Sequence, residues 1–489
     1  MKKSLLSGLF WILLANLVVK PFWLLGVEVG VQNAVGTEMY GFYFTIFNLT
    51  YILNILLDLG ITNFNTRNIA QYPKLIGKHL PSILSVKLML LLLYAVVTFS
   101  VGALLGYSSR QFYLLVWLCL NQFLNSLILY LRSNFEGLLL FKWDSLLSVM
   151  DRLLMILICG LLLWNPAGRI CGQFTIYHFV YAQTASYAIT AVLALTVLVR
   201  RAGLRRLRWN WPFSLAIMKK SMPFALLVLL MASYNRLDPV LLQKLSPEGM
   251  GDYNAGIYAG AFRLLDALTM VAYMVSVPLL PIFSRMTKKP MSAGGELHET
   301  VRMMFSLVMV FALTAACALA SVGEGLMACL YHENGATYVG VFRVVVFCII
   351  PISVTYVFGT LLTAAGRLRQ LNLFAALSLT LNVAVNLLCI PRWGAVGSAW
   401  AGLTAQCFMA VAQMVASIKL FRINISVGYI LKIALFALLI VACTQCCARM
   451  TWWVALVVAA VVAIGLATLF RLIDIKEIVN IVKSKENNN

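Results

Sequence analysis

The chain has 489 residues, of which 62% are hydrophobic and only 11% are charged, and its mean hydropathy is +0.90. Soluble domains carry about 25% charged residues, so this composition excludes a soluble globular protein and indicates a polytopic membrane protein. The net charge is +21, but the basic residues cluster in short loops, which favours membrane topology over nucleic acid as a partner. With only four histidines and irregularly spaced cysteines, we expect no metal site and no cofactor.

Apolar runs of about 20 residues, the length that crosses a bilayer, recur along the whole chain. We predict fourteen transmembrane helices, at residues 5–31, 39–69, 80–106, 111–138, 144–164, 171–199, 215–243, 253–284, 302–322, 338–365, 371–390, 394–418, 428–447 and 451–471. With a cytoplasmic N-terminus, 23 basic residues fall in cytoplasmic segments and 5 in outer loops. Because basic residues favour cytoplasmic loops, both termini are predicted to be cytoplasmic.

The first predicted helix carries Lys20, which is followed directly by Pro21. Lys20 lies about 24 Å into the span at 1.5 Å per residue, so its ammonium cannot easily reach the membrane surface. Proline bends a helix and frees a carbonyl nearby. A basic group at this depth is a functional candidate by default.

The second predicted helix contains the stretch "LLDLGITNFNTRNIA", residues 56–70. Four side chains fall within about 80° of one another at 100° per residue and form one predicted polar stripe: Asn54, Asp58, Thr62 and Asn65. Arg67 lies near the opposite side of this helix, at its cytoplasmic end. Two interpretations of Arg67 stay open, namely contact with a lipid phosphate and simple anchoring of the helix.

The chain repeats a short motif at an offset of 215 residues. "GTEMYGFY" begins at Gly36 and "GDYNAGIY" begins at Gly251, and both have the pattern G-x4-G-(F/I)-Y. The offset aligns the first six helices with the next six, and an even number of helices gives both copies the same orientation. We therefore predict an all-α integral membrane fold of about fourteen helices. It has two pseudo-symmetric six-helix lobes, residues 1–205 and 206–425, plus two C-terminal helices within 426–489.

The seventh and eighth predicted helices also carry charges. "SYNRLDPVLL", residues 233–242, includes Arg236 and Asp238, and the offset aligns Lys20 with Asn235, one position from Arg236. The eighth helix carries Arg263 and Asp266 three residues apart, close enough to interact on one helix face. Structural ion pairs and ligand binding both stay open for these residues.

Basic residues slightly outnumber acidic ones at predicted membrane depth. The bases are Lys20, Arg67, Lys87, Arg132, Arg152, Arg236 and Arg263, and the acids are Glu28, Asp58, Glu136, Asp151, Asp238 and Asp266. A base-lined cleft between the lobes favours a phosphate or another anion, which arginine binds bidentately. The P-loop motif G-x4-G-K-(S/T) is absent from the sequence, which excludes ATP hydrolysis at that motif as the energy source. An ion gradient, the membrane potential or a substrate gradient remains as the energy source.

Several segments resemble bacterial O-antigen and polysaccharide flippases of the multidrug/oligosaccharidyl-lipid/polysaccharide exporter superfamily. They are residues 36–70, "MGDYNAGIYAGAFRLLDAL" at 250–268, "LLTAAGRLRQ" at 361–370 and "NLLCIPRWGAVGSAWA" at 386–401. The resemblance spans nearly the whole chain. It implies a non-enzymatic transporter that moves an undecaprenyl-diphosphate-linked oligosaccharide to the outer leaflet by alternating access.

The resemblance also implies roles for the charged positions. The diphosphate is expected near Lys20, Arg236 and Arg263, with Arg67, Asn54 and Asn65 as further binding residues of the cavity. The candidates for ion coupling or internal ion pairing are Asp58, Asp238 and Asp266. The expected setting is a monomer in the bacterial inner membrane, with H⁺ or Na⁺ as coupling ion. Its expected partners are lipid-linked oligosaccharide, membrane phospholipid, a polysaccharide polymerase and chain-length proteins.

Two alternatives remain. A drug/cation antiporter of the same superfamily predicts a cavity dominated by acids. A membrane glycosyltransferase, polymerase or ligase needs a sizeable loop for acid/base residues. The longest outer loop candidate, residues 323–340, holds Glu324, His332 and Glu333, and it can hold a short interfacial helix.

Overall fold

The computed structural model describes residues 19, 21–72, 76–138, 140–164, 173–202, 225–276, 279–287, 294–333, 335–423, 426–447 and 450–472. Every regular element among these residues is a helix. Eleven of the described helices are long and apolar enough to cross a membrane, or twelve if the bent pair Ala225–Arg236 and Asp238–Leu245 forms one span. The all-α, multi-pass membrane fold is thereby confirmed, whereas the number fourteen stays a prediction.

The chain divides into two compact units, residues 1–259 and 260–489. The first unit contains η1 (Trp23–Glu28), α2 (Val29–Val35), α3 (Thr37–Leu53), η2 (Asn54–Leu57), α4 (Ile61–Gln71), α5 (Ile76–Leu104), α6 (Ser109–Gly137), α7 (Phe141–Leu163), α8 (Ile176–Ala202), the helix Ala225–Arg236, α10 (Asp238–Leu245) and the first part of α11 (Gly251–Ser276). The predicted lobe boundaries at residues 205 and 425 lie outside the described residues, so the lobe division stays a prediction.

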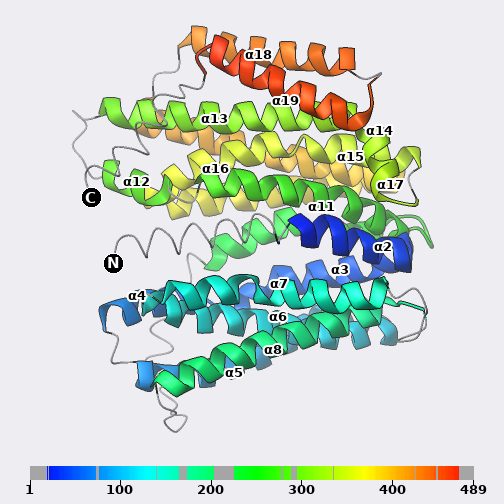
Figure 1. The fold of residues 1–489 in the computed structure, drawn as a ribbon, viewed down its shortest axis with the longest axis vertical. Helices are drawn as coiled ribbons and strands as arrows, with labels where there is room; N and C mark the ends of the chain where they lie inside the picture. The colour runs from blue at the N-terminus through cyan, green and yellow to red at the C-terminus, as the bar shows by residue number, and fades with distance from the viewer. Residues whose placement is uncertain are drawn as a thin grey trace. The chain divides into compact units, whose positions relative to one another are not determined.

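Helix α6 is the centre of the first unit, where it packs against α3, α4, α5, α7 and α8 (Figure 1). Its start is fixed by a capping box, in which Ser108 and Gln111 satisfy each other's backbone N–H groups. The helix buries apolar residues such as Leu118 and Phe135 together with polar ones such as Ser126 and Ser133. Buried polar groups need hydrogen-bonding partners, so α6 is where polar side chains of neighbouring helices converge.

The second unit contains the rest of α11, α12 (Leu279–Met286), α13 (Gly294–Ser321), α14 (Gly323–Leu330), α15 (Ala336–Val346), α16 (Ile349–Ala364), α17 (Leu368–Phe421), α18 (Val427–Cys446) and α19 (Trp452–Leu469). Helix α17 joins the predicted spans 371–390 and 394–418 at Gly394, whose φ of 52° and ψ of −129° are not helical. The short helix expected within residues 323–340 is α14.

The last two helices, α18 and α19, lie against α13 in the second unit (Figure 1). Helix α19 buries an alanine at every fourth position: Ala455, Ala459, Ala463 and Ala467. Small residues let membrane helices approach closely, because hydrocarbon around them gives little hydrophobic drive to association. The spacing of four residues places all of these alanines on one face of the helix.

Candidate functional site

The second predicted span is not one continuous helix. Helix α3 ends at Leu53, the 3₁₀ turn η2 follows, and the backbone then turns through Leu59 and Gly60, with φ of 44° and 80°, before α4 begins. Positive φ costs a leucine energy and suits glycine. The predicted stripe from Asn54 to Asn65 assumed 100° per residue throughout, so that alignment is wrong. The sequence signal for the break was Gly60 within a span.

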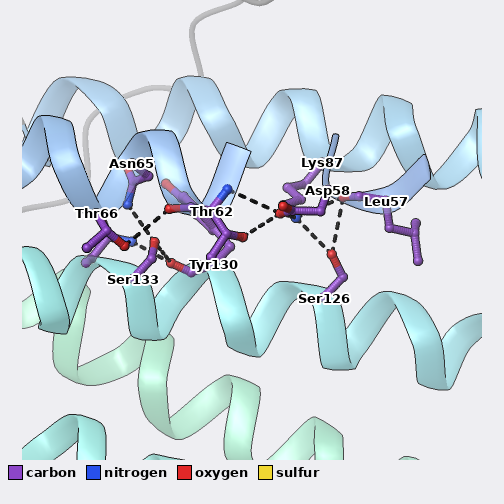
Figure 2. Close-up of polar contacts among 10 residues, drawn as sticks. Leu57, Asp58, Thr62, Asn65, Thr66, Lys87, Ser126, Tyr130 and Ser133 are labelled. Carbon is purple, nitrogen blue, oxygen red and sulfur yellow. Dashed lines mark hydrogen bonds and ion pairs between the residues drawn. The ribbon is translucent and has the colours of Figure 1, made fainter. Parts of the chain in front are cut away.

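The ammonium of Lys87 on α5 fills this break (Figure 2). It donates to three oxygens at 2.8 Å each: Leu57 O, Asp58 Oδ1 and Ser126 Oγ. The Ser126 hydroxyl on α6 also donates to Leu57 O at 3.2 Å. Lys87 is 1% exposed and Asp58 is 26% exposed, so this is a largely buried ion pair that ties α5 and α6 to the broken segment.

Residues of α4 continue this set of polar contacts beside α6. The Thr62 hydroxyl donates to Asp58 Oδ1, and the buried Asn65 donates through Nδ2 to Ser133 Oγ at 2.8 Å (Figure 2). Thr66 donates to Glu136 Oε2 at 3.3 Å. Asp58 is therefore an internal ion-pair partner, and Asn65 joins two helices of the first unit. Arg67 lies in α4, but its side chain is outside the described residues, and Asn54 is a half-buried residue at the start of η2.

Arg132 and Glu136 lie four positions apart on α6 and interact electrostatically. Arg132 Nε also donates to Asp144 Oδ1 on α7, at 2.7 Å. Asp144 follows the turn that joins α6 to α7, so the pair closes that turn. The neighbours Asp151 and Arg152 also form an ion pair, with 3.5 Å between Oδ2 and Nε.

The seventh predicted span bends by 48° between Ala225–Arg236 and Asp238–Leu245. Pro239 at the start of α10 suits such a break, since proline is tolerated in the first turn of a helix. The Arg236 guanidinium carbon lies 5.3 Å from the centre of the Tyr51 ring, a cation–π contact. Asp238 is 1% exposed and accepts a hydrogen bond of 2.7 Å from the Tyr258 hydroxyl.

In the second unit, Arg263 is 3% exposed and donates through Nη1 to the Tyr331 hydroxyl at 3.0 Å. Tyr331 in turn donates to Gly260 O at 3.2 Å, which fixes the tyrosine against α11. Asp266 is half-buried on the next turn of α11, and its backbone carbonyl accepts from Thr269. Lys20 lies outside the described residues.

The two copies of the repeated glycine motif contact each other within the first unit. A Cβ atom added to Gly41 would overlap the carbonyl oxygen of Asp252, and one added to Gly256 would overlap the carbonyl oxygen of Thr37. Each pair joins the sixth position of one copy to the second position of the other, so the contact is reciprocal. The Gln32 side chain also donates to Gly256 O at 3.1 Å. The repeat therefore marks a close backbone crossing of α3 and α11.

Sequence reasoning missed two features of the first unit. Lys87 was recognised only as a charge at depth, and its partner Asp58 is 29 positions away, beyond any helical periodicity. The second feature is an aromatic cluster around Glu28, whose members come from four segments of the chain. Within the described residues, no group of three or more His, Cys, Asp or Glu side chains is placed to hold a metal ion.

A family model described as "Polysaccharide biosynthesis protein" matches residues 5–287. The fold is similar to that of "Lipid II flippase MurJ, inward closed conformation", with 13% identity, a TM-score of 0.70, and coverage of 94% of this chain and 98% of that one. It is also similar to an inward-facing multidrug resistance MATE family transporter of the MOP superfamily, with 15% identity, a TM-score of 0.63, and coverage of 82% and 94%.

A third similar structure is a MOP superfamily transporter from Pyrococcus furiosus, described as having a binding pocket of reverse polarity. It has 12% identity, a TM-score of 0.55, and coverage of 86% of this chain and 96% of that one. No curated protein matches the sequence.

Proposed function

The chain belongs to the polysaccharide biosynthesis protein family, and we propose that it is a flippase for a lipid-linked oligosaccharide. The substrate is an undecaprenyl-diphosphate-linked repeat unit of O-antigen, capsular polysaccharide or exopolysaccharide. It moves from the inner to the outer leaflet of the bacterial cytoplasmic membrane by alternating access. The observation that carries this proposal is the family match over residues 5–287, which include every one of the nine candidate site residues.

In this proposal Lys20, Arg236 and Arg263 bind the diphosphate. Arg236 supports the assignment best, because its guanidinium lies over the Tyr51 ring in a cation–π contact and a guanidinium can bind phosphate oxygens bidentately. Arg263 is almost fully buried and hydrogen-bonded to Tyr331, so its role requires the transport cycle to expose it. Arg67, Asn54 and Asn65 remain proposed cavity residues, with Asn65 in a structural hydrogen bond to Ser133.

We place both termini in the cytoplasm and couple transport to an H⁺ or Na⁺ gradient, with Asp238 and Asp266 as the candidate coupling acids. Asp58 is assigned to its ion pair with Lys87. A polysaccharide polymerase and chain-length proteins are the proposed partners of a monomeric transporter. They would receive the flipped repeat unit at the outer leaflet.

The test is complementation of polysaccharide export in a strain that lacks this gene. Lys20→Ala, Arg236→Ala and Arg263→Ala should each abolish export while the protein remains in the membrane at wild-type abundance. Arg343→Ala is the matched control, because Arg343 is 48% exposed and pairs with Glu324 at 3.0 Å. Wild-type export by the first three variants would refute the diphosphate assignment.

A drug/cation antiporter is the second candidate, supported by the similar fold of the MATE transporter. It predicts that expression of this protein raises resistance to cationic drugs, whereas the flippase predicts no such change. The two assays therefore separate the candidates in the same strain. Sugar transfer by the purified protein would instead support the third candidate, a membrane glycosyltransferase, polymerase or ligase.

A further inference from the structure

A π-helical turn in the first unit brings Trp23 and Glu28 together. η1 runs from Trp23 to Glu28, and the Trp23 indole Nε1 donates to Glu28 Oε1 at 2.9 Å. In an α-helix, side chains five residues apart point about 140° away from each other at 100° per residue, whereas the i→i+5 winding of a π-helix aligns them. The Tyr40 hydroxyl on α3 donates to the other Glu28 oxygen at 3.3 Å.

Aromatic rings surround this carboxylate. Trp23 stacks on Phe179 of α8, with ring centres 5.9 Å apart and planes 7° apart. Tyr43 packs edge-on against the same phenylalanine, with ring centres 5.4 Å apart. Trp23, Tyr43 and Tyr187 are each less than 5% exposed. The cluster is therefore a largely buried set of ring faces beside an acid.

The guanidinium of Arg152, on α7, lies close to two of these rings. Its carbon is 5.6 Å from the centre of the Trp23 ring and 5.9 Å from the centre of the Tyr187 ring, both within the range of cation–π attraction. Arg152 also interacts electrostatically with Glu28 and Asp151. Its side chain is 27% exposed, so it is not fully enclosed by its neighbours.

Aromatic faces combined with a carboxylate are the chemistry that binds organic cations. We propose that Trp23, Glu28 and Tyr187 form an organic-cation site that Arg152 of the same chain permanently occupies. The ligand class is a planar guanidinium, and the chain supplies it as a tethered side chain. With this site filled, Glu28 is not a coupling acid, and the cluster offers no place for a free cationic drug.

The proposal is tested by emptying the site and refilling it. Arg152→Ala in the full-length, detergent-solubilised protein should lower the midpoint of thermal unfolding, and millimolar methylguanidinium should restore part of it. The same concentrations of NaCl and KCl should not. Wild-type protein, whose site is filled, should show no gain. The absence of a selective methylguanidinium effect on Arg152→Ala would overturn the proposal.

A matched pair of variants tests whether the ring faces form the site. The double variant Trp23→Leu, Arg152→Ala lacks one ring face as well as the guanidinium. Methylguanidinium should therefore shift its midpoint of thermal unfolding at most slightly. Trp23→Leu alone is the control. Rescue equal to that of Arg152→Ala would overturn the proposal, because binding would not need the ring.

A second measurement does not depend on Arg152→Ala being folded. Glu28→Gln keeps the Trp23 hydrogen bond to an oxygen and removes the titratable acid, so it should retain most polysaccharide export. Loss of export at wild-type protein abundance is the result expected for a coupling acid, and it would overturn the assignment. If the wild type itself does not support export, the proposed function fails, whereas the methylguanidinium experiment still tests the cation site.

Discussion

The ion pair between Lys87 and Asp58 makes a quantitative prediction about stability. Lys87→Met keeps most of the side-chain volume but removes the ammonium, which leaves the Asp58 carboxylate without its cation. Breaking a buried pair by removing one partner costs about 3–5 kcal/mol. Leu57 O keeps the Ser126 hydroxyl as donor, and Asp58 keeps Thr62. Because Asp58 is also 26% exposed, we expect the low end, about 3 kcal/mol.

The assay is reversible unfolding of the purified protein in mixed micelles of increasing SDS content, followed by circular dichroism. Asp58→Asn should cost at least as much as Lys87→Met, because it strands the deeper member of the pair, which is 1% exposed. The double variant, Lys87→Met with Asp58→Asn, should lower the free energy of unfolding by less than about 1.5 kcal/mol, because no unpaired charge remains. A double variant as unstable as the sum of the two single variants would refute the reasoning, because the two charges would then act independently.

The remaining predictions concern glycines and use the same unfolding assay. Gly41→Ala and Gly256→Ala should each lower the free energy of unfolding by about 1–3 kcal/mol, because a methyl group would overlap a backbone carbonyl across the crossing. Gly30→Ala is the control, because the atom nearest to its added Cβ, on the Leu163 side chain, is 3.5 Å away. This change should be neutral or slightly stabilising. A loss of stability equal to that of Gly41→Ala would contradict the overlap argument. Gly60→Ala should cost about 1–2 kcal/mol because φ is 80°, and Gly60→Asn should cost less; equal costs would contradict a left-handed requirement.

The membrane fold was predictable from sequence because its main determinant is hydropathy, which is local in the chain. Long apolar runs and short basic loops indicated a multi-pass all-α protein, and Pro239 is the sequence signal for the bend before α10. The break at Leu59 and Gly60 was harder, because a single glycine inside an apolar span is usually tolerated. The break is stabilised by Lys87 of α5, whose ammonium donates a hydrogen bond to the Leu57 carbonyl. This partner lies on another helix, so local sequence does not indicate it.

Candidate site residues were predictable in type but not in pairing. Charges at membrane depth stand out in an apolar sequence, so Asp58, Arg236 and Asp238 were identified as candidates. Their neighbours depend on tertiary packing: Tyr51 lies 185 positions before Arg236, and Tyr258 lies 20 positions after Asp238. Periodicity within one helix carries no such information, so it cannot indicate that Arg132 also pairs with Asp144 on α7.

The reciprocal glycine crossing has a consequence for the origin of the chain. Each copy of the motif gives one carbonyl and one glycine and receives the same from the other. This is the geometry of an isologous interface, in which one surface patch is complementary to itself. Two identical half-length chains related by a two-fold axis would make this contact without any change. Fusion of two such copies would preserve an interface that a homodimer already satisfies, and this is the origin that the predicted repeat at an offset of 215 residues implies.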